Sequence, residues 1–202
     1  ATEEVFIHFT ATLRENKPWA DAGYVVAEEK LQIRNAQKPM YDFTKRAADS
    51  DLNVEETSTQ ITVSGKRFKA TFSKTYGTLS GYVYDDVSMM SRPLLLNVFR
   101  LPTDNDGRQT SSWDAMGLRK LTVKDATIET QVGEDGKTVN VDCSSTHNGQ
   151  NGTSFDVNLN FIVCADGAIM VNSFIRPSNS GAILPKIGFR LEMPASMERL
   201  EW

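Results

Sequence analysis

The stretch FDVNLNFIVCADGAIMVNSFI, residues 155–175, decides the fold class of this 202-residue chain. Apolar and polar residues alternate over residues 155–163, and residues 168–175 form a second strand-like run. Alternation with a period of two is typical of a β-strand that buries one face. Asp166-Gly167 lies between the two runs, and an Asp-Gly pair in that position is a strong signal for a β-hairpin turn. The stretch therefore predicts two antiparallel strands.

The same pattern recurs along the chain, and the connections between runs are rich in Gly, Asn and Asp. The strand candidates are residues 5–13, 24–33, 61–63, 68–72, 82–84, 93–99, 121–131, 138–143 and 183–193. The helix signal is weak, since only residues 112–121 could hold a turn or two, with Ser112 as N-cap. We therefore predict an all-β fold, an antiparallel β-sandwich.

A polar, charged stretch divides the chain and predicts its domain organisation. Residues 39–57 contain Pro39 and the run AADSDLNVEE, a composition typical of a linker. We expect residues 1–38 and residues 58–202 to belong to different domains. Two strands cannot bury a core of their own, so the first segment needs further sheet from elsewhere.

Composition and charge exclude several classes of partner. The net charge is −4, and the 22 Lys and Arg residues are scattered, which argues against nucleic acid or an anionic membrane as main partner. No apolar run approaches the ~20 residues of a membrane-spanning helix. The first residues, ATEEVFIHF, lack the features of a signal peptide. We expect a soluble bacterial protein, and the choice between cytoplasm and periplasm stays open. For Cys143 and Cys164, two separate buried thiols are favoured over one disulfide, and no spacing indicates zinc.

The most unusual polar stretch is FRLPTDNDGRQTSSW, residues 99–113. An EF-hand reading fails, because Gly107 at position 6 puts Pro102 and Trp113 at the ligand positions 1 and 12. A looser cation site formed by Asp104 and Asp106 stays open. The plainer alternative is a tight turn in which Asp and Asn side chains cap backbone amides and Gly107 has a positive φ.

Catalysis by this chain alone is not indicated. Asp104 and Asp106 would need different environments to act as a glycosidase carboxylate pair, and nothing apolar surrounds them in sequence. The chain's two histidines, His8 and His147, have no neighbouring nucleophile in sequence. The three tryptophans, Trp19, Trp113 and Trp202, could each stack on a sugar, although a structural role is favoured for any one alone.

Four segments, in order along the chain, resemble a known family. FRLPTDNDG followed by W-x-x-x-G-L-x-x-L (Trp113, Gly117, Leu118, Leu121) is similar to a motif of the small-chain domain of family 2 β-galactosidases, with Leu101 replacing an alanine. LPKIGFRLEMPASMERLEW (residues 184–202) and KRFKATFSKTYGTLSGYVYDD (residues 66–86) resemble two further parts of that domain. ENKPWADAGYVVAEEKLQI (residues 15–33) resembles the last strands of the preceding immunoglobulin-like domain.

The resemblance implies a fold and a parent activity. Residues 58–202 would form the first part of a galactose-mutarotase-like supersandwich, and residues 1–38 the end of an immunoglobulin-like sandwich. The parent would be a retaining glycosidase that hydrolyses terminal β-D-galactosides with two glutamates of a (β/α)8 barrel outside this chain. We therefore expect no catalytic residue, metal or cofactor here, although the parent could use Mg or Na ions in other domains.

The resemblance also assigns a role to the polar stretch. The loop of residues 107–112 would reach towards the active site of the barrel, and its root would be fixed by neighbouring side chains. The loop and root residues are Arg100, Asp104, Asn105, Asp106, Gly107, Arg108 and Trp113. Expected partners are the barrel of the parent chain and a β-galactoside, and a homo-oligomer stays open because an incomplete sandwich has unpaired edges. The alternative function is a free-standing carbohydrate-binding β-sandwich.

Overall fold

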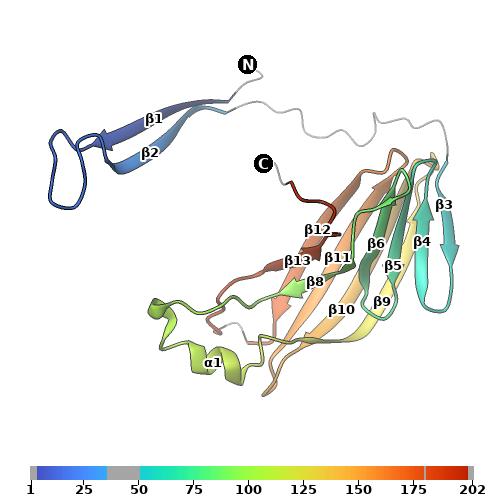
Figure 1. Cartoon of the computed structure of the whole chain (residues 1–202). Helices are drawn as coiled ribbons and strands as arrows, with labels where there is room; N and C mark the ends of the chain where they lie inside the picture. Colours follow the sequence, from blue (N-terminus) through green and yellow to red (C-terminus); the bar gives the residue numbers. More distant parts are fainter. Residues whose placement is uncertain (1–3, 36–50, 180, 200–202) are drawn as a thin grey trace. The chain divides into compact units, whose positions relative to one another are not determined.

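The structure is a computed structural model that describes residues 4–35, 51–179 and 181–199 (Figure 1). It divides into two compact units, Ala1–Phe43 and Thr44–Trp202. The described part of the first unit is a single antiparallel hairpin of β1 (Val5–Thr12) and β2 (Val25–Arg34). Its apolar side chains, among them Phe9, Leu31 and Ile33, are exposed. The hairpin therefore buries no core of its own, and its assignment to an immunoglobulin-like domain of residues 1–38 stays a prediction.

The second unit contains two antiparallel sheets that face each other (Figure 1). One sheet follows the chain order through β3 (Asn53–Glu56), β4 (Gln60–Ser64), β5 (Phe68–Ser73), β6 (Thr78–Tyr84) and β7 (Val87–Ser88). The other has the order β12-β11-β10-β9 and contains β9 (Thr122–Val132), β10 (Thr138–Asn148), β11 (Ser154–Cys164) and β12 (Ile169–Pro177). The predicted all-β antiparallel sandwich is confirmed, and its place within a larger supersandwich stays a prediction.

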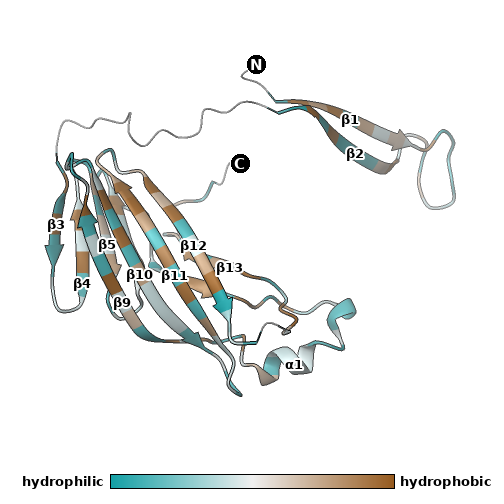
Figure 2. Ribbon diagram, turned by 180° about the vertical axis from the view of Figure 1, so that it is seen from behind, coloured by the Kyte–Doolittle hydropathy of each residue, from teal (hydrophilic) through white to brown (hydrophobic). Residues whose placement is uncertain are grey.

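The core forms where the alternating apolar faces of the two sheets meet. In β10, for example, Val139, Val141 and Cys143 are buried while the residues between them point away from the core. Phe72 of β5 and Phe161 of β11, both fully buried, join the sheets edge to face with ring centroids 5.2 Å apart. Figure 2 shows the resulting alternation of apolar and polar residues along the long strands.

Cys143 and Cys164 are both buried and are not joined by a disulfide, so the prediction of two separate thiols is confirmed. Burial in the sheet raises the pKa of the Cys143 thiol to about 12, which keeps it protonated near neutral pH.

The hairpin predicted from residues 155–175 is present as β11 and β12. Gly167 in its turn has φ +93°, a conformation that favours glycine, and a Cβ there would lie 2.9 Å from the Tyr82 hydroxyl oxygen. The preceding strand is longer than predicted, because β10 continues to Asn148 through polar residues on its outer face. His147 is consequently a buried residue of β10.

β8 (Arg92–Asn97) pairs with β13 (Gly188–Glu192), which is much shorter than the predicted strand of residues 183–193. Between β8 and β9 the chain forms a 3-10 turn, η1 (Asp104–Asp106), and the short helix α1 (Thr110–Ala115). The N-cap of α1 is Gln109, so the prediction of Ser112 as the cap is wrong. Among the described residues, no helix has the length and apolar character needed to cross a membrane.

The linker also ends earlier than the sequence predicts. Asn53–Glu56, within the predicted range of residues 39–57, forms β3 and pairs with β4. The Leu52 amide donates to the Gly136 carbonyl at 3.0 Å, and Lys137 Nζ lies 3.0 Å from Asp51 Oδ1. The second unit therefore includes residues 51–57, whereas residues 36–50 lie outside the described part of the chain.

Candidate functional site

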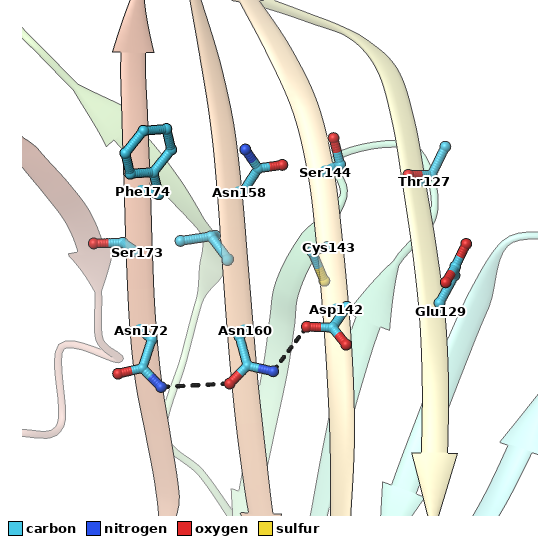
Figure 3. Close-up of a pocket in the computed structure, with 11 residues that line it drawn as sticks. Thr127, Glu129, Asp142, Cys143, Ser144, Asn158, Asn160, Asn172, Ser173 and Phe174 are labelled. Atoms are coloured by element: carbon cyan, nitrogen blue, oxygen red, sulfur yellow. Dashed lines mark hydrogen bonds between the residues drawn. The ribbon is translucent and has the colours of Figure 1, made fainter.

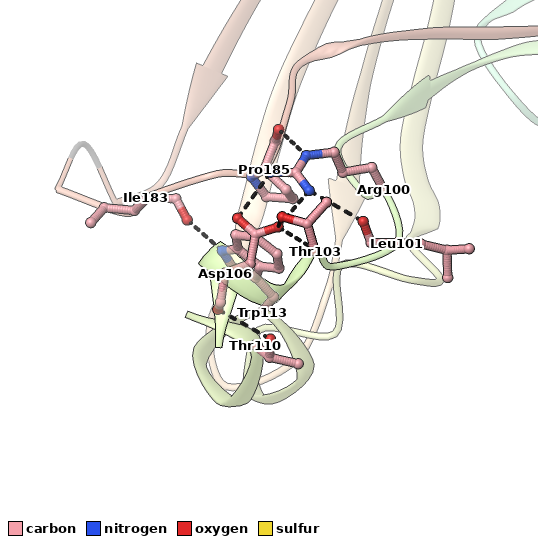
Figure 4. A network of polar contacts seen from close by, with 8 residues as sticks. All are labelled: Arg100, Leu101, Thr103, Asp106, Thr110, Trp113, Ile183 and Pro185. Atoms are coloured by element: carbon pink, nitrogen blue, oxygen red, sulfur yellow. Dashed lines mark hydrogen bonds and ion pairs between the residues drawn. The ribbon is translucent and has the colours of Figure 1, made fainter. Parts of the chain in front are cut away.

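The polar stretch folds around an ion pair between Arg100 and Asp106 (Figure 4). Arg100 Nη1 lies 2.6 Å from Asp106 Oδ2, and Arg100 Nη2 lies 2.9 Å from Asp106 Oδ1, so the contact is bidentate. The same guanidinium donates from Nε to the Pro185 carbonyl at 3.3 Å and from Nη1 to the Leu101 carbonyl at 3.2 Å. Arg100 thus closes the loop on itself and ties it to the segment before β13.

Asp106 is the centre of the loop root. Its Oδ2 accepts hydrogen bonds from the Thr103 amide at 2.7 Å and from the Thr103 hydroxyl at 2.9 Å. The pKa of this carboxyl lies well below its usual range. The main cause is the hydrogen bonding from Arg100, and the second is the hydrogen bond from the Thr103 amide. The prediction that an acidic side chain caps a backbone amide is confirmed. Gly107, however, has φ −49°, so its predicted positive φ is wrong: it continues the helical turn from η1.

Trp113 anchors the loop from beneath. Its side chain is only 2% exposed, and its Nε1 donates to the Ile183 carbonyl at 2.9 Å. The guanidinium carbon of Arg100 lies 5.6 Å from the Trp113 ring centroid. The hypothesis that Trp113 stacks on a sugar is therefore wrong, because its ring belongs to the core. Of the other two tryptophans, Trp19 is 65% exposed and contacts Tyr24 edge-on, and Trp202 lies outside the described residues.

The C-terminal end of α1 is fixed to the turn between β10 and β11. The Gln150 amide donates to the Met116 carbonyl, and Asn151 Nδ2 donates to the Ala115 carbonyl, both at 2.8 Å. Gly117 has φ +68°, and a Cβ there would lie 2.9 Å from the Gln150 nitrogen. Leu118 then enters the core at 2% exposure. These contacts give a physical reason for the W-x-x-x-G-L pattern.

The tip of the loop is exposed and makes few contacts. Asp104, Asn105, Gly107, Arg108 and Ser112 are all exposed. Among the described residues, no hydrogen bond or ion pair is formed by the side chains of Asp104, Asn105 and Arg108. The framework of the loop root is therefore Arg100, Asp106 and Trp113, together with Thr103. The side chain of Asp104, which the sequence groups with this framework, is not part of it.

This geometry argues against both other interpretations of the two carboxylates. Asp106 is held ionised, and both its oxygens accept from Arg100, so it cannot serve as a proton donor to a leaving group. The same two contacts occupy the oxygens that a cation would need. Within the described residues, no group of three or more His, Cys, Asp or Glu side chains is arranged to hold a metal ion.

Several residues of the root could not be identified from their residue type. Ile183 and Pro185 act through their backbone carbonyls, and Gln150 acts through its backbone N–H. Backbone groups leave no compositional signal. The one signal in the sequence is that residues 184–202 carry a second motif of the same family as the loop, which is consistent with contact between the two segments.

Replacing Asp106 by asparagine tests the root directly. The amide side chain would keep the shape of the carboxylate but lose the negative charge that Arg100 and Thr103 bind. We expect amide hydrogen exchange across residues 101–113 to become about tenfold faster, because the loop would open locally more often. Hydrogen exchange followed by mass spectrometry measures this, with Asp104→Asn as a matched control that should leave exchange unchanged. Equal exchange in Asp106→Asn and the unmodified protein would contradict the role of the ion pair.

A β-sandwich carrying a loop anchored at both ends is the class of domain that these observations define. The model of the family described as "Beta galactosidase small chain" matches residues 64–202. The chain belongs to this family.

Curated relatives are similar over nearly the whole chain. A beta-galactosidase of Priestia megaterium is 26% identical over all of the chain, and one of Halalkalibacterium halodurans is 27% identical over 98% of it. A beta-galactosidase of Alteromonas mediterranea is 30% identical over half of the chain. In the first two relatives the match covers 19% of their length, so the chain spans about a fifth of these proteins.

Proposed function

We propose that this chain is a non-catalytic part of a β-galactosidase, a retaining glycosidase that hydrolyses terminal β-D-galactosides. The family of residues 64–202 and the names of the relatives support this proposal. The observation that carries it is the loop of residues 107–112, whose root is held by Arg100, Asp106 and Trp113 while its tip is exposed. The proposed partners are a catalytic barrel in the same polypeptide and a β-galactoside.

The geometry suits a loop that borders a substrate site. A fixed root positions the tip before substrate arrives, so little conformational entropy is lost when a sugar is bound. Arg108 at the tip is exposed and can donate hydrogen bonds to sugar hydroxyls. Over the mouth of a barrel, such a loop would exclude water and influence which aglycone fits.

The 202-residue chain alone is expected to release no nitrophenol from p-nitrophenyl β-D-galactoside above the uncatalysed rate. The reason is that the two proposed catalytic glutamates belong to a barrel outside this chain, and that Asp106, which Arg100 holds ionised, cannot act as an acid. Turnover that disappears in Asp104→Asn would overturn the proposal and support a carboxylate pair within this domain.

A second arm uses a longer β-galactosidase polypeptide that contains this sequence. There, Arg108→Ala is expected to raise KM for lactose about fivefold with kcat nearly unchanged, since one charged hydrogen bond to bound sugar is lost. Lys120→Ala, which removes an exposed cation outside the loop, is the matched control. Identical kinetics for both variants would contradict the proposal that the loop borders the substrate site.

A further inference from the structure

The outward face of the sheet β9–β12 carries two aligned rows of side chains, with one residue from each strand in each row (Figure 3). Strand register places Glu129, Asp142, Asn160 and Asn172 side by side in the first row. Two residues further along, Thr127, Ser144, Asn158 and Phe174 form the second row. We call these eight residues the outer-face rows. They line a hollow of about 450 Å³, a volume typical of small-ligand sites.

The first row is organised by a chain of hydrogen bonds. Asn172 Nδ2 donates to Asn160 Oδ1 at 3.4 Å, and Asn160 Nδ2 donates to Asp142 Oδ1 at 2.7 Å (Figure 3). These bonds fix the orientation of the Asn160 amide. The second oxygen of Asp142 and the carboxylate of Glu129 have no partner within the described part of the chain. The row therefore presents unused carboxylate acceptors to the hollow, and Asn160 holds one of the two, Asp142, in place.

The next row along the same strands shows that this arrangement is not general for the sheet. It contains Lys124, Thr146, Asp156 and Arg176. Its one carboxylate is paired with a cation, since Arg176 Nη2 lies 2.9 Å from Asp156 Oδ2. In the first row, by contrast, Glu129 and Asp142 are directly opposite each other on neighbouring strands, a pairing of like charges that disfavours the sheet. Hydrogen-bond donors from a ligand would relieve this repulsion.

Phe174 is the other unusual residue of this face. Its side chain is 64% exposed at the end of the second row, beside polar neighbours. An exposed aromatic ring offers a flat apolar surface on which the C–H face of a sugar ring can lie. The side chain of Ser144, which is exposed on the same face, adds a hydroxyl group to the lining of the hollow. An apolar platform beside carboxylate and amide acceptors matches a ligand that has one apolar face and many O–H donors.

We propose that the outer-face rows bind a neutral mono- or disaccharide. The sugar ring lies against Phe174, and its hydroxyls donate to Asp142 and Glu129. Because the hollow is shallow and open, the affinity is in the millimolar range, about 1–10 mM. This binding goes beyond the function proposed above, since it requires neither the loop of residues 107–112 nor a catalytic barrel.

To test the proposal, the 202-residue chain is titrated with lactose and, separately, with maltose. Binding is monitored through the asparagine side-chain amide signals in ¹⁵N NMR spectra. We expect the signals of Asn158, Asn160 and Asn172 to move on addition of up to about 50 mM sugar. Phe174→Ala and Asp142→Asn are each expected to weaken binding about fivefold, by loss of ring contact and of a charged acceptor respectively. Both positions are exposed, so neither change removes core packing.

Two control variants remove matched groups elsewhere. Trp19→Ala removes an exposed aromatic ring of the hairpin, and Asp86→Asn removes an exposed carboxylate of the turn between β6 and β7; neither should alter the titration. The proposal is overturned if the three asparagine signals do not move, or if they move equally in Phe174→Ala and the unmodified chain. It is likewise overturned if spermidine moves them and the sugars do not, because the face would then be a cation site.

Discussion

Replacing Trp113 by alanine is expected to lower the free energy of unfolding of the second unit by about 3–5 kcal/mol, the range for large aromatic side chains removed from a core. The indole is 2% exposed and packs in the same cluster as Leu118 and Val98. Alanine would leave a cavity and also remove the donor that satisfies the Ile183 carbonyl. The change is read from the urea midpoint of equilibrium unfolding, followed by circular dichroism.

Trp113→Phe separates the two contributions. It keeps most of the buried ring but removes the hydrogen bond from Nε1 to Ile183, so a smaller loss of about 1–2 kcal/mol is expected. If Trp113→Ala and Trp113→Phe cost the same, packing of the indole would contribute little, and the loop would be held mainly by its polar contacts. A Trp113→Ala protein as stable as the original would contradict the buried placement of the side chain.

Acidification from pH 6.5 to about 4 is expected to destabilise the second unit by about 3 kcal/mol through His147 alone. This side chain is 4% exposed in β10, and burial lowers its pKa from 6.5 to about 4. Above pH 6.5 the imidazole is neutral in both states, and the stability is fully present. As the pH falls, the unfolded chain takes up a proton that the folded chain does not, so stability is lost until the folded pKa is reached.

His147→Gln serves as the reference for this effect, because glutamine does not titrate in the interval. The free energy of unfolding is obtained from urea unfolding at pH 7.5 and at pH 4.5 for both proteins. Between these pH values it should fall by about 2–3 kcal/mol more in the original chain than in His147→Gln. Asp106 does not interfere in this interval, because its lowered pKa places its loss of stability below 3.8, the ordinary value for the group. Equal pH dependence in the two proteins would show that His147 is not buried as described.

Most of the strands could be predicted because apolar and polar residues alternate along a strand that buries one face. This pattern can be recognised within the sequence of a single strand. The pairing of strands is not local. The run of residues 183–193 alternates, but only Gly188–Glu192 pairs with β8, because the preceding residues are used as carbonyl acceptors for Arg100 and Trp113. Likewise β3 is polar in sequence, and its pairing with the edge of β4 could not be seen in its composition.

The candidate site was predicted in part. The cluster of charges in residues 99–113 correctly indicated a stabilised loop, since an Arg and an Asp six residues apart can close a short segment. The sequence did not distinguish Asp106, which both Arg100 and Thr103 bind, from Asp104, which is exposed. It also missed the polar rows on β9–β12, because their residues are separated in sequence and become neighbours only through strand register.

The anchoring of the loop has a consequence for how this domain is made. The acceptors at Ile183 and Pro185 lie 70 residues after Trp113 and 85 residues after Arg100, respectively. During synthesis from the N-terminus, the partners of the loop therefore leave the ribosome long after the loop itself, at an interval of about 4–17 seconds for ordinary rates of translation. The loop acquires its final geometry only when the sheets beneath it are complete, so a correctly shaped loop reports that the domain has finished folding.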